Sequence, residues 1–155
     1  MTDRIDQKLA ELGLTLPTAA APVATYVPAV EAGGLLHVSG QLPFRDGKVV
    51  TGQLGTDVDV AAGQEAAKLC ALMVVAQAKA ALGGDLSRVA RIVKLGVFVN
   101  SAAGFGDQPE VANGASDLMV ALFDDKGKHA RAAVGVAALP RNAAVEVDAI
   151  IAVTN

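Results

Sequence analysis

The chain has 155 residues, a formal net charge of −3 and an isoelectric point near 5.3. This length fits one domain with a substantial core. The acidic balance argues against a general nucleic-acid surface, because such surfaces cluster lysine and arginine. Apolar residues make up 52% of the chain and aromatic ones only 3%, which favours closely spaced elements and a large subunit interface. We therefore expect a single domain over residues 1–155 that forms an oligomer.

The distribution of polar residues limits where the protein works. The most apolar stretch, residues 69–82, contains Gln77 and Lys79. These come too early for a membrane span of about 20 residues, so no transmembrane helix is expected. The first residues lack the apolar core of a secretory signal, which favours a cytoplasmic location. The single cysteine, Cys70, excludes an intrachain disulfide, and its apolar helical surroundings predict a buried, unreactive thiol.

The first elements form an N-terminal arm and an extended segment. A short amphipathic helix, capped by Thr2 or Asp3 and ending near Leu12, lies within an arm of residues 1–16. Three prolines then keep residues 15–34 extended, in part as an edge strand.

The middle of the chain predicts a strand, a long helix and another strand. Alternation over residues 35–43 predicts the first strand. Asp57 or Asp59 begins the longest helix, and the glycine pair that starts at Gly83 ends it. β-branched residues over 89–101 predict the second strand.

The last third predicts a helix and two strands. Residues 104–109 form an ordinary loop, since no strand-to-helix glycine fingerprint of a phosphate site surrounds them. Residues 110–125 form the helix, and residues 129–153 form a hairpin with a Pro-Arg-Asn turn at 140–142. This order predicts an α+β sandwich with the helices on one face of the sheet.

Arg131 and Glu146 are the candidate site residues of this hairpin. Each is a charge inside an otherwise apolar strand, and such charges usually have a partner or a ligand. If Leu139 pairs with Ala144, both charges point to the same sheet face but lie roughly 20 Å apart along the strands. One chain then cannot bring both to one small ligand. We expect a pocket between subunits that combines Arg131 of one chain with Glu146 of another.

Five segments of the chain resemble the YjgF/RidA family, also called the L-PSP family, which has a chorismate-mutase-like fold with a mixed sheet. The segments are TYVPAV at Tyr26, HVSGQLP at Ser39, IVKLGVFV from Ile92, HARAAV at Arg131, and ALPRNAAVEVDAI at Glu146. They occur in the family's order and with its spacing. The N-terminal arm and the GASDLMVALF helix are similar to the branch that carries an endoribonuclease name.

The resemblance implies a homotrimer with a pocket at each subunit interface. It also implies hydrolysis of reactive enamines and imines, such as 2-aminoacrylate and 2-iminopropionate, to 2-keto acids and ammonia. Arg131 would bind the substrate carboxylate, which suits the fork of a guanidinium. Glu146 would position or deprotonate water. No metal and no organic cofactor is required.

The same resemblance implies the remaining site residues. Three of them line the pocket: Tyr26, Ser39 and Gly40. Ala133 would help to orient water through its main-chain carbonyl. The family's asparagine on the second long helix falls at Ser116 or is replaced by Asn113, and both alternatives stay open.

Structural interpretations compete with these roles. Arg131 could form an interface salt bridge, Glu146 could be a surface group, and Tyr26 could cap the sheet edge. The segment HARA at residues 129–132 stands where the family often has Pro-Ala-Arg-Ser, so a hydroxyl beside the arginine is missing.

Three functions follow in order of preference. The first is the enamine/imine deaminase, and the second is a regulatory trimer that binds small carboxylates without turnover. The third is an endoribonuclease or translation inhibitor, as the older family label says. RNA cleavage needs an acid/base pair, and the chain has only two histidines. The strand position of His37 favours a structural sheet residue over a base. His129, beside Arg131, is a candidate pocket contact.

Overall fold

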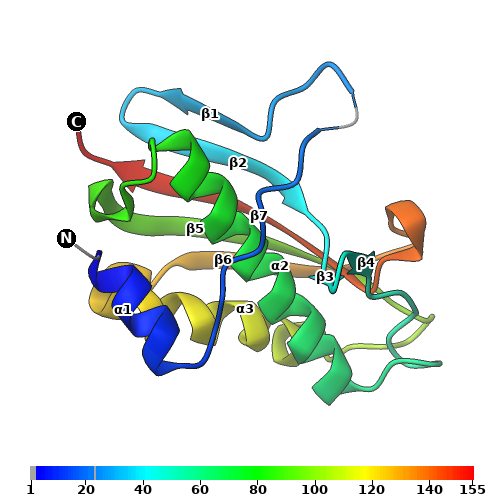
Figure 1. The fold of residues 1–155 in the computed structure, drawn as a ribbon. Helices are drawn as coiled ribbons and strands as arrows, with labels where there is room; N and C mark the ends of the chain where they lie inside the picture. Colours follow the sequence, from blue (N-terminus) through cyan, green and yellow to red (C-terminus); the bar gives the residue numbers. More distant parts are fainter. Residues whose placement is uncertain (1–2, 23) are drawn as a thin grey trace.

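A mixed five-stranded sheet forms the centre of the computed structural model, which describes residues 3–22 and 24–155. The strands lie in the order β1-β2-β7-β5-β6 (Figure 1). Their bounds are β1 Ala29–Ala32, β2 Leu35–Gln41, β5 Val89–Asn100, β6 Ala130–Val136 and β7 Val145–Val153. Neighbours pair antiparallel except β5 and β6, which pair in parallel. A separate ladder joins β3 (Phe44–Arg45) to β4 (Lys48–Val49).

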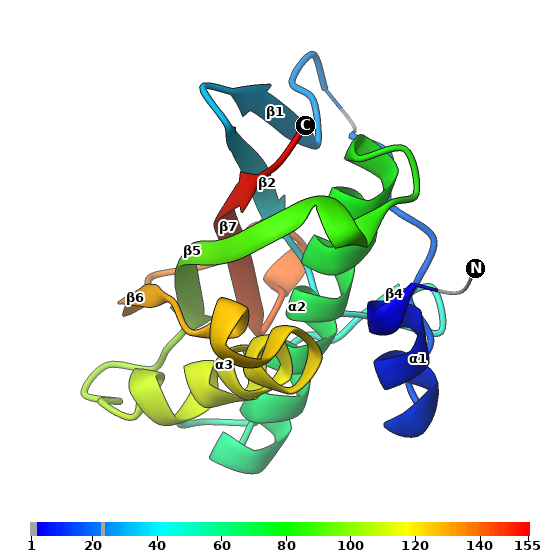
Figure 2. The ribbon, with the colours of Figure 1, turned by 90° about the vertical axis from the view of Figure 1, so that its left-hand side faces the viewer.

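Two long helices, α2 (Val60–Ala81) and α3 (Gln108–Phe123), cover one face of this sheet (Figure 2). A short helix, α1 (Arg4–Glu11), packs against α3. Within the described residues there are also three 3-10 turns: Leu86–Arg88, Asp124–Gly127 and Pro140–Asn142. This arrangement confirms the predicted α+β fold. Among the described residues, none of the helices combines the length and the apolar character that a membrane crossing needs.

The ends of the helices follow the capping residues that the sequence offers. The Asp3 carboxylate accepts a hydrogen bond from the backbone N–H two residues on, at 3.1 Å, and Asp59 accepts one from the N–H three residues on, at 2.8 Å. Asp59 rather than Asp57 therefore begins α2. Thr2, the other candidate cap of α1, lies outside the described residues. Gly83, with φ at +68°, ends the last turn of α2 in the left-handed region.

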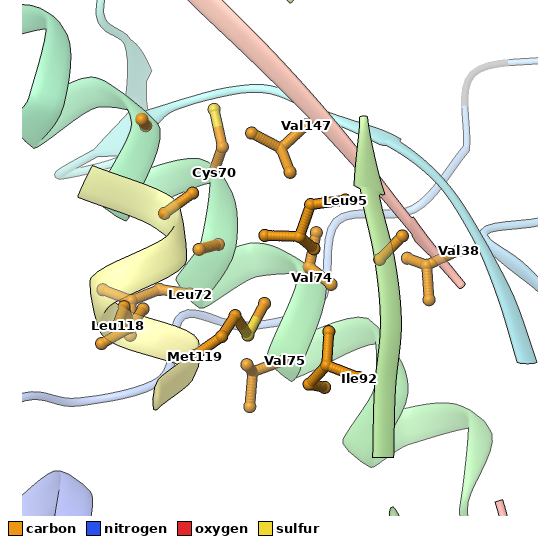
Figure 3. Close-up of a cluster of buried hydrophobic side chains, with 14 of the residues drawn as sticks. Val38, Cys70, Leu72, Val74, Val75, Ile92, Leu95, Leu118, Met119 and Val147 are labelled. Atoms are coloured by element: carbon orange, nitrogen blue, oxygen red, sulfur yellow. The ribbon is translucent and has the colours of Figure 1, made fainter. Parts of the chain in front are cut away.

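Aliphatic side chains fill the space between the sheet and the helices. Leu95 of β5 and Val147 of β7 point into this layer and are fully buried (Figure 3). Cys70 of α2 is buried with them, and its Sγ lies 3.5 Å from the Val145 carbonyl oxygen. Burial raises the pKa of the Cys70 thiol well above its usual range, and the nearby negative charge of Glu146 raises that pKa further. The prediction of a buried core thiol is confirmed.

The predicted terminal hairpin is wrong. β6 and β7 do not pair, because β5 lies between them, parallel to β6 and antiparallel to β7. Alternation along a strand shows which residues share a face, but it does not identify the neighbouring strand. The crossover through α3 allows β6 to return parallel to β5. Residues 137–144 then carry the chain past the end of β5 to its other edge.

The two long helices approach each other closely at Gly114. A Cβ added there would lie 2.0 Å from the backbone oxygen of Gln64 and 2.8 Å from its Cα. The Gln64 side chain also donates a hydrogen bond to the Glu110 carbonyl oxygen at 2.8 Å. The missing side chain at Gly114 thus sets the position of α3, which carries Asn113 and Ser116.

We expect Gly114→Ala to lower the free energy of unfolding by about 1–3 kcal/mol, because the methyl group would overlap a backbone carbonyl that moves only with its helix. Chemical unfolding measures this change. Gly106→Ala is the matched control, since an added Cβ there meets nothing within 4 Å. Equal stability of the two variants would contradict the proposed close contact.

Candidate functional site

Arg131 lies on the edge strand β6, and its guanidinium reaches the first turns of α3. Nη1 donates to Asn113 Oδ1 at 2.9 Å and to Ser116 Oγ at 3.1 Å. Nη2 donates to the Pro109 carbonyl oxygen at 3.3 Å. All three acceptors are neutral, and Arg131 forms no salt bridge with any residue that the structure describes. The half-buried positive charge is therefore held in place without being neutralised.

Asn113 and Ser116 both contact this guanidinium from positions three residues apart on one face of α3. The sequence left open which of them lies near the arginine, and the structure brings both to Nη1. A guanidinium has five N–H donors, of which three are occupied here. The Nε–H and one Nη2–H find no acceptor within the described residues. Nε and one terminal nitrogen form one edge of the fork, the arrangement that binds a carboxylate bidentately.

A β-bulge in β2 organises a second part of the site. Val38 pairs with Ala149 of β7 and Gln41 with Val147, so three steps along β2 match two steps along β7. A bulge of this kind changes the direction in which side chains point and recurs near functional sites. The bulge contains Ser39 and Gly40, which places both predicted lining residues opposite β7.

Gly40 lies directly against the Glu146 side chain. A Cβ added at Gly40 would come within 2.9 Å of Cδ and Oε1 of Glu146. Any side chain larger than hydrogen at this position would therefore displace the carboxyl group. This contact explains why position 40 is occupied by glycine, which the sequence pattern alone did not show.

Ser39 holds the segment that contains Tyr26. Its hydroxyl donates to the Val27 carbonyl oxygen at 2.9 Å, and its backbone N–H donates to the Pro28 carbonyl oxygen at 2.9 Å. Tyr26 is 52% exposed beside this contact. The predicted residues Tyr26, Ser39 and Gly40 thus gather at one end of β2.

Two buried glutamines support the bulge and were not predicted as site residues. Gln41 Nε2 donates to the Ser39 carbonyl oxygen at 2.9 Å. Gln77 Nε2 donates to Gln41 Oε1 at 3.3 Å and to the Ala20 carbonyl oxygen at 2.7 Å. The sequence signal for both glutamines is a polar residue at an otherwise apolar position of its element.

Glu146 projects from β7 on the sheet face opposite the helices, where it is half-buried. Burial raises the pKa of the Glu146 carboxyl, and the negative charge of Asp148, two residues along the same face, raises it further. A carboxyl with a raised pKa exchanges its proton closer to neutral pH. This is the property that a general base or acid requires.

Arg131 and Glu146 lie on opposite faces of the sheet. On the intervening strand, Arg131 aligns with Leu95 and Glu146 with Phe98, three residues further along. An odd offset reverses the face. Two strand spacings and three residues of rise place their backbones roughly 14 Å apart. The prediction of a shared face is wrong because it depended on the hairpin, but one chain still does not bring the two charges together.

The predicted residues therefore form two groups. The arginine group lies on β6 and the facing side of α3, and its members are Arg131, Asn113, Ser116 and Ala133, which points to the helices like Arg131. The glutamate group lies at the β2 bulge and on the open sheet face, and its members are Tyr26, Ser39, Gly40 and Glu146.

The other candidates do not join these groups into one site. His37 is exposed on the open face of β2, whereas His129 contacts Ser116 on the helix side. The loop from Gly104 to Gly106 connects β5 to α3, and Phe105 within it packs against the core. The residues that the structure describes contain no group of three or more His, Cys, Asp or Glu side chains that could hold a metal ion.

Comparison with protein families identifies the chain. The model for "YjgF/chorismate_mutase-like, putative endoribonuclease" proteins matches residues 6–152. The chain belongs to this family. Protein TCP17 of Trypanosoma cruzi is 56% identical over 154 residues, which cover 98% of this chain and 96% of that protein. A 2-iminobutanoate/2-iminopropanoate deaminase of Dermatophagoides farinae is 28% identical over 142 residues, covering 90% and 94%.

Solved structures share the fold to different degrees. The Agrobacterium tumefaciens protein Atu1372, described as of unknown function, is 53% identical with a TM-score of 0.92 and covers 97% of this chain and 93% of its own. The Escherichia coli protein TdcF with bound serine is 26% identical with a TM-score of 0.60, covering 88% and 94%. The family is therefore shown, while a named activity comes only from relatives of lower identity.

The raised pKa of Glu146 predicts a specific dependence of stability on pH. Because the folded state raises this pKa, ionising Glu146 lowers stability as pH rises from the ordinary glutamate range through the folded-state pKa. Glu146→Gln should then melt at a higher temperature than the wild type near neutral pH. The difference should vanish below the ordinary glutamate range, where the wild-type carboxyl is protonated in both states. Thermal unfolding across pH measures this, and an offset that does not change with pH would contradict it.

Proposed function

We propose that this protein hydrolyses reactive enamines and imines of the 2-aminoacrylate and 2-iminopropionate type to 2-keto acids and ammonia. The observation that carries this proposal is the guanidinium of Arg131, which is half-buried, has no salt bridge within the described residues and keeps two N–H donors free. The deaminase relative supports the reaction class. The relative with bound serine supports a small ligand that carries a carboxylate.

The two groups of residues have complementary chemistry for this reaction. The free N–H donors of Arg131 bind the substrate carboxylate and thereby fix the adjacent C=N carbon. Glu146 removes a proton from water as the water oxygen bonds to that carbon. Glu146 returns that proton to the nitrogen, which gives a carbinolamine with an NH2 group. As the C–N bond breaks, the hydroxyl proton passes to the nitrogen, which leaves as ammonia. Water supplies the keto oxygen, and no electrons are exchanged with another reagent.

We propose that the pocket forms between subunits of a homotrimer. The arginine and glutamate groups face opposite sides of one sheet, so a second copy is needed to join them. The open sheet face also presents Val30, 51% exposed, and Val134, 47% exposed, together with half-buried Phe98 and Ile150. Exposed apolar side chains gathered on one face favour burial against another protein surface. A neighbouring arginine group placed over this face would complete the pocket.

The same arginine also supports a second candidate, binding of small carboxylates without turnover. Ligand-dependent thermal stabilisation with no product would indicate it. A ribonuclease receives no such support within one chain, because the two histidines lie on opposite sides of the sheet. The formal net charge of −3 also does not favour contacts with RNA phosphates.

Purified protein should accelerate release of 2-keto acid from imines generated in solution. Arg131→Ala should abolish the acceleration, and Arg131→Lys should retain only part of it, because an ammonium does not offer the bidentate fork. Arg45→Ala, at an exposed position on β3, is the matched control and should keep full activity. Keto-acid release followed over several amino-acid-derived imines measures this. An Arg131→Ala rate equal to the wild-type rate would refute the carboxylate role.

Mixing two inactive variants tests whether the pocket lies between subunits. Arg131→Ala and Glu146→Gln chains are unfolded together and refolded in equal amounts. About three quarters of the trimers are then mixed, each with one intact pocket of three, so about a quarter of wild-type activity should return. Each variant refolded alone is the control. A mixture as inactive as its components would show that both residues must come from the same chain.

A further inference from the structure

His129 forms a hydrogen-bonded chain that ends at the proposed carboxylate-binding arginine. Its Nδ1 lies 2.6 Å from the Gly127 carbonyl oxygen, and its Nε2 lies 2.8 Å from Ser116 Oγ. Ser116 Oγ in turn accepts from Arg131 Nη1 at 3.1 Å. The imidazole is half-buried, immediately before β6 and on the same side of the sheet as Arg131.

Elementary hydrogen-bond chemistry fixes the direction of this chain. A carbonyl oxygen only accepts, so Nδ1 of His129 carries the proton that faces Gly127. In the neutral imidazole Nε2 is then an acceptor, and Ser116 must donate its hydroxyl hydrogen to it. The hydroxyl lone pairs remain for the N–H of Arg131. With a neutral imidazole, every donor in this hydrogen-bonded chain therefore faces an acceptor.

The direction matters because Ser116 lies within a helix. A serine hydroxyl in a helix otherwise turns to the carbonyl four residues earlier, which would change the lone pairs that it presents to the guanidinium. His129 holds the hydroxyl away from that alternative. With Asn113 as the second acceptor at Nη1, two fixed points set the plane of the guanidinium and leave its Nε–H and one Nη2–H for a ligand.

We propose that His129 is a positioning residue for substrate binding, acting through the hydroxyl of Ser116 on the guanidinium of Arg131. This inference rests on the proposed role of Arg131 in binding a carboxylate. His129 touches no reacting atom, so its effect falls on the affinity for the carboxylate and on KM more than on kcat.

Two substitutions of His129 separate its two hydrogen bonds. His129→Gln places an amide oxygen near the reach of Nε2, so it retains an acceptor for Ser116. His129→Asn is shorter, so it retains a donor for Gly127 and loses the acceptor for Ser116. Calorimetric binding of pyruvate gives the readout without requiring turnover, and KM and kcat for the imine are measured beside it.

We expect His129→Asn to weaken pyruvate binding by about tenfold, the size of one lost hydrogen bond, whereas His129→Gln should stay within about twofold of the wild type. Ser116→Ala should weaken binding about as much as His129→Asn, and the double variant should lose no more than either one. If Gln and Asn behave alike, or if the two losses multiply in the double variant, His129 does not act through Ser116.

Nitrogen NMR of the wild-type protein with the imidazole neutral provides a second test. The His129 resonances should show the proton on Nδ1, and a proton on Nε2 would overturn the proposed direction of the chain. This measurement is independent of how well any variant folds. Thermal unfolding of each variant identifies a general loss of structure, which would lower kcat and affinity together.

These measurements also separate this inference from the proposed function. Turnover by the wild type with unchanged KM and pyruvate affinity in His129→Asn would overturn the positioning role alone. If the variants show the expected changes in pyruvate affinity but the wild type shows no turnover, the proposed deaminase function is overturned and the positioning role of His129 is supported. A wild-type protein that neither binds pyruvate nor releases 2-keto acid from imines would overturn both.

Discussion

The pairing of β5 with strands on both of its edges determines where the charges of this protein lie. β6 pairs with one edge in parallel and β7 with the other antiparallel, so two strands that follow each other in the chain are separated by a third. The three-residue offset between the partners of Arg131 and Glu146 then sends one side chain toward the helices and the other toward the open face. A hairpin with the same residues would have produced a different surface.

The two charges also differ in how the fold stabilises them. Arg131 donates hydrogen bonds to Asn113 and Ser116 of α3, which is held close to α2 at Gly114. Glu146 is half-buried against a glycine and beside another carboxylate, and burial first, then the charge of Asp148, raises its pKa and so disfavours its ionised form. A carboxyl in this state gains from a ligand or a water that can share its proton. In the proposed reaction, function and stability would therefore make opposite demands at Glu146, as is common at active sites.

The sequence predicted the helices, most strands and the candidate residues because these depend on local patterns. Asp59 and the glycines after Leu82 define α2, and alternation defines the strands. The order of the strands depends on the crossover through α3, which no short pattern encodes. The prediction that Arg131 and Glu146 share a sheet face was wrong for this reason. The bulge at Ser39 and the glutamines beneath it depend on side chains of β2 and α2 and on a backbone carbonyl of the N-terminal segment, which lie far apart in the sequence. Ser116 and Asn113 could not be distinguished because both belong to the same helical face.

The choice of neutral acceptors around Arg131 explains how a site can hold a cation and still attract an anion. A carboxylate partner would fix the guanidinium equally well, but it would also cancel the charge and occupy the edge that binds a carboxylate. Asparagine, serine and a backbone carbonyl fix the geometry while leaving the charge in place. The cost of holding that charge in a half-buried position is offset when an anion binds. The absence of an acidic partner among the described residues is therefore a property that favours binding, and His129 extends the same strategy by acting on the arginine through a hydroxyl.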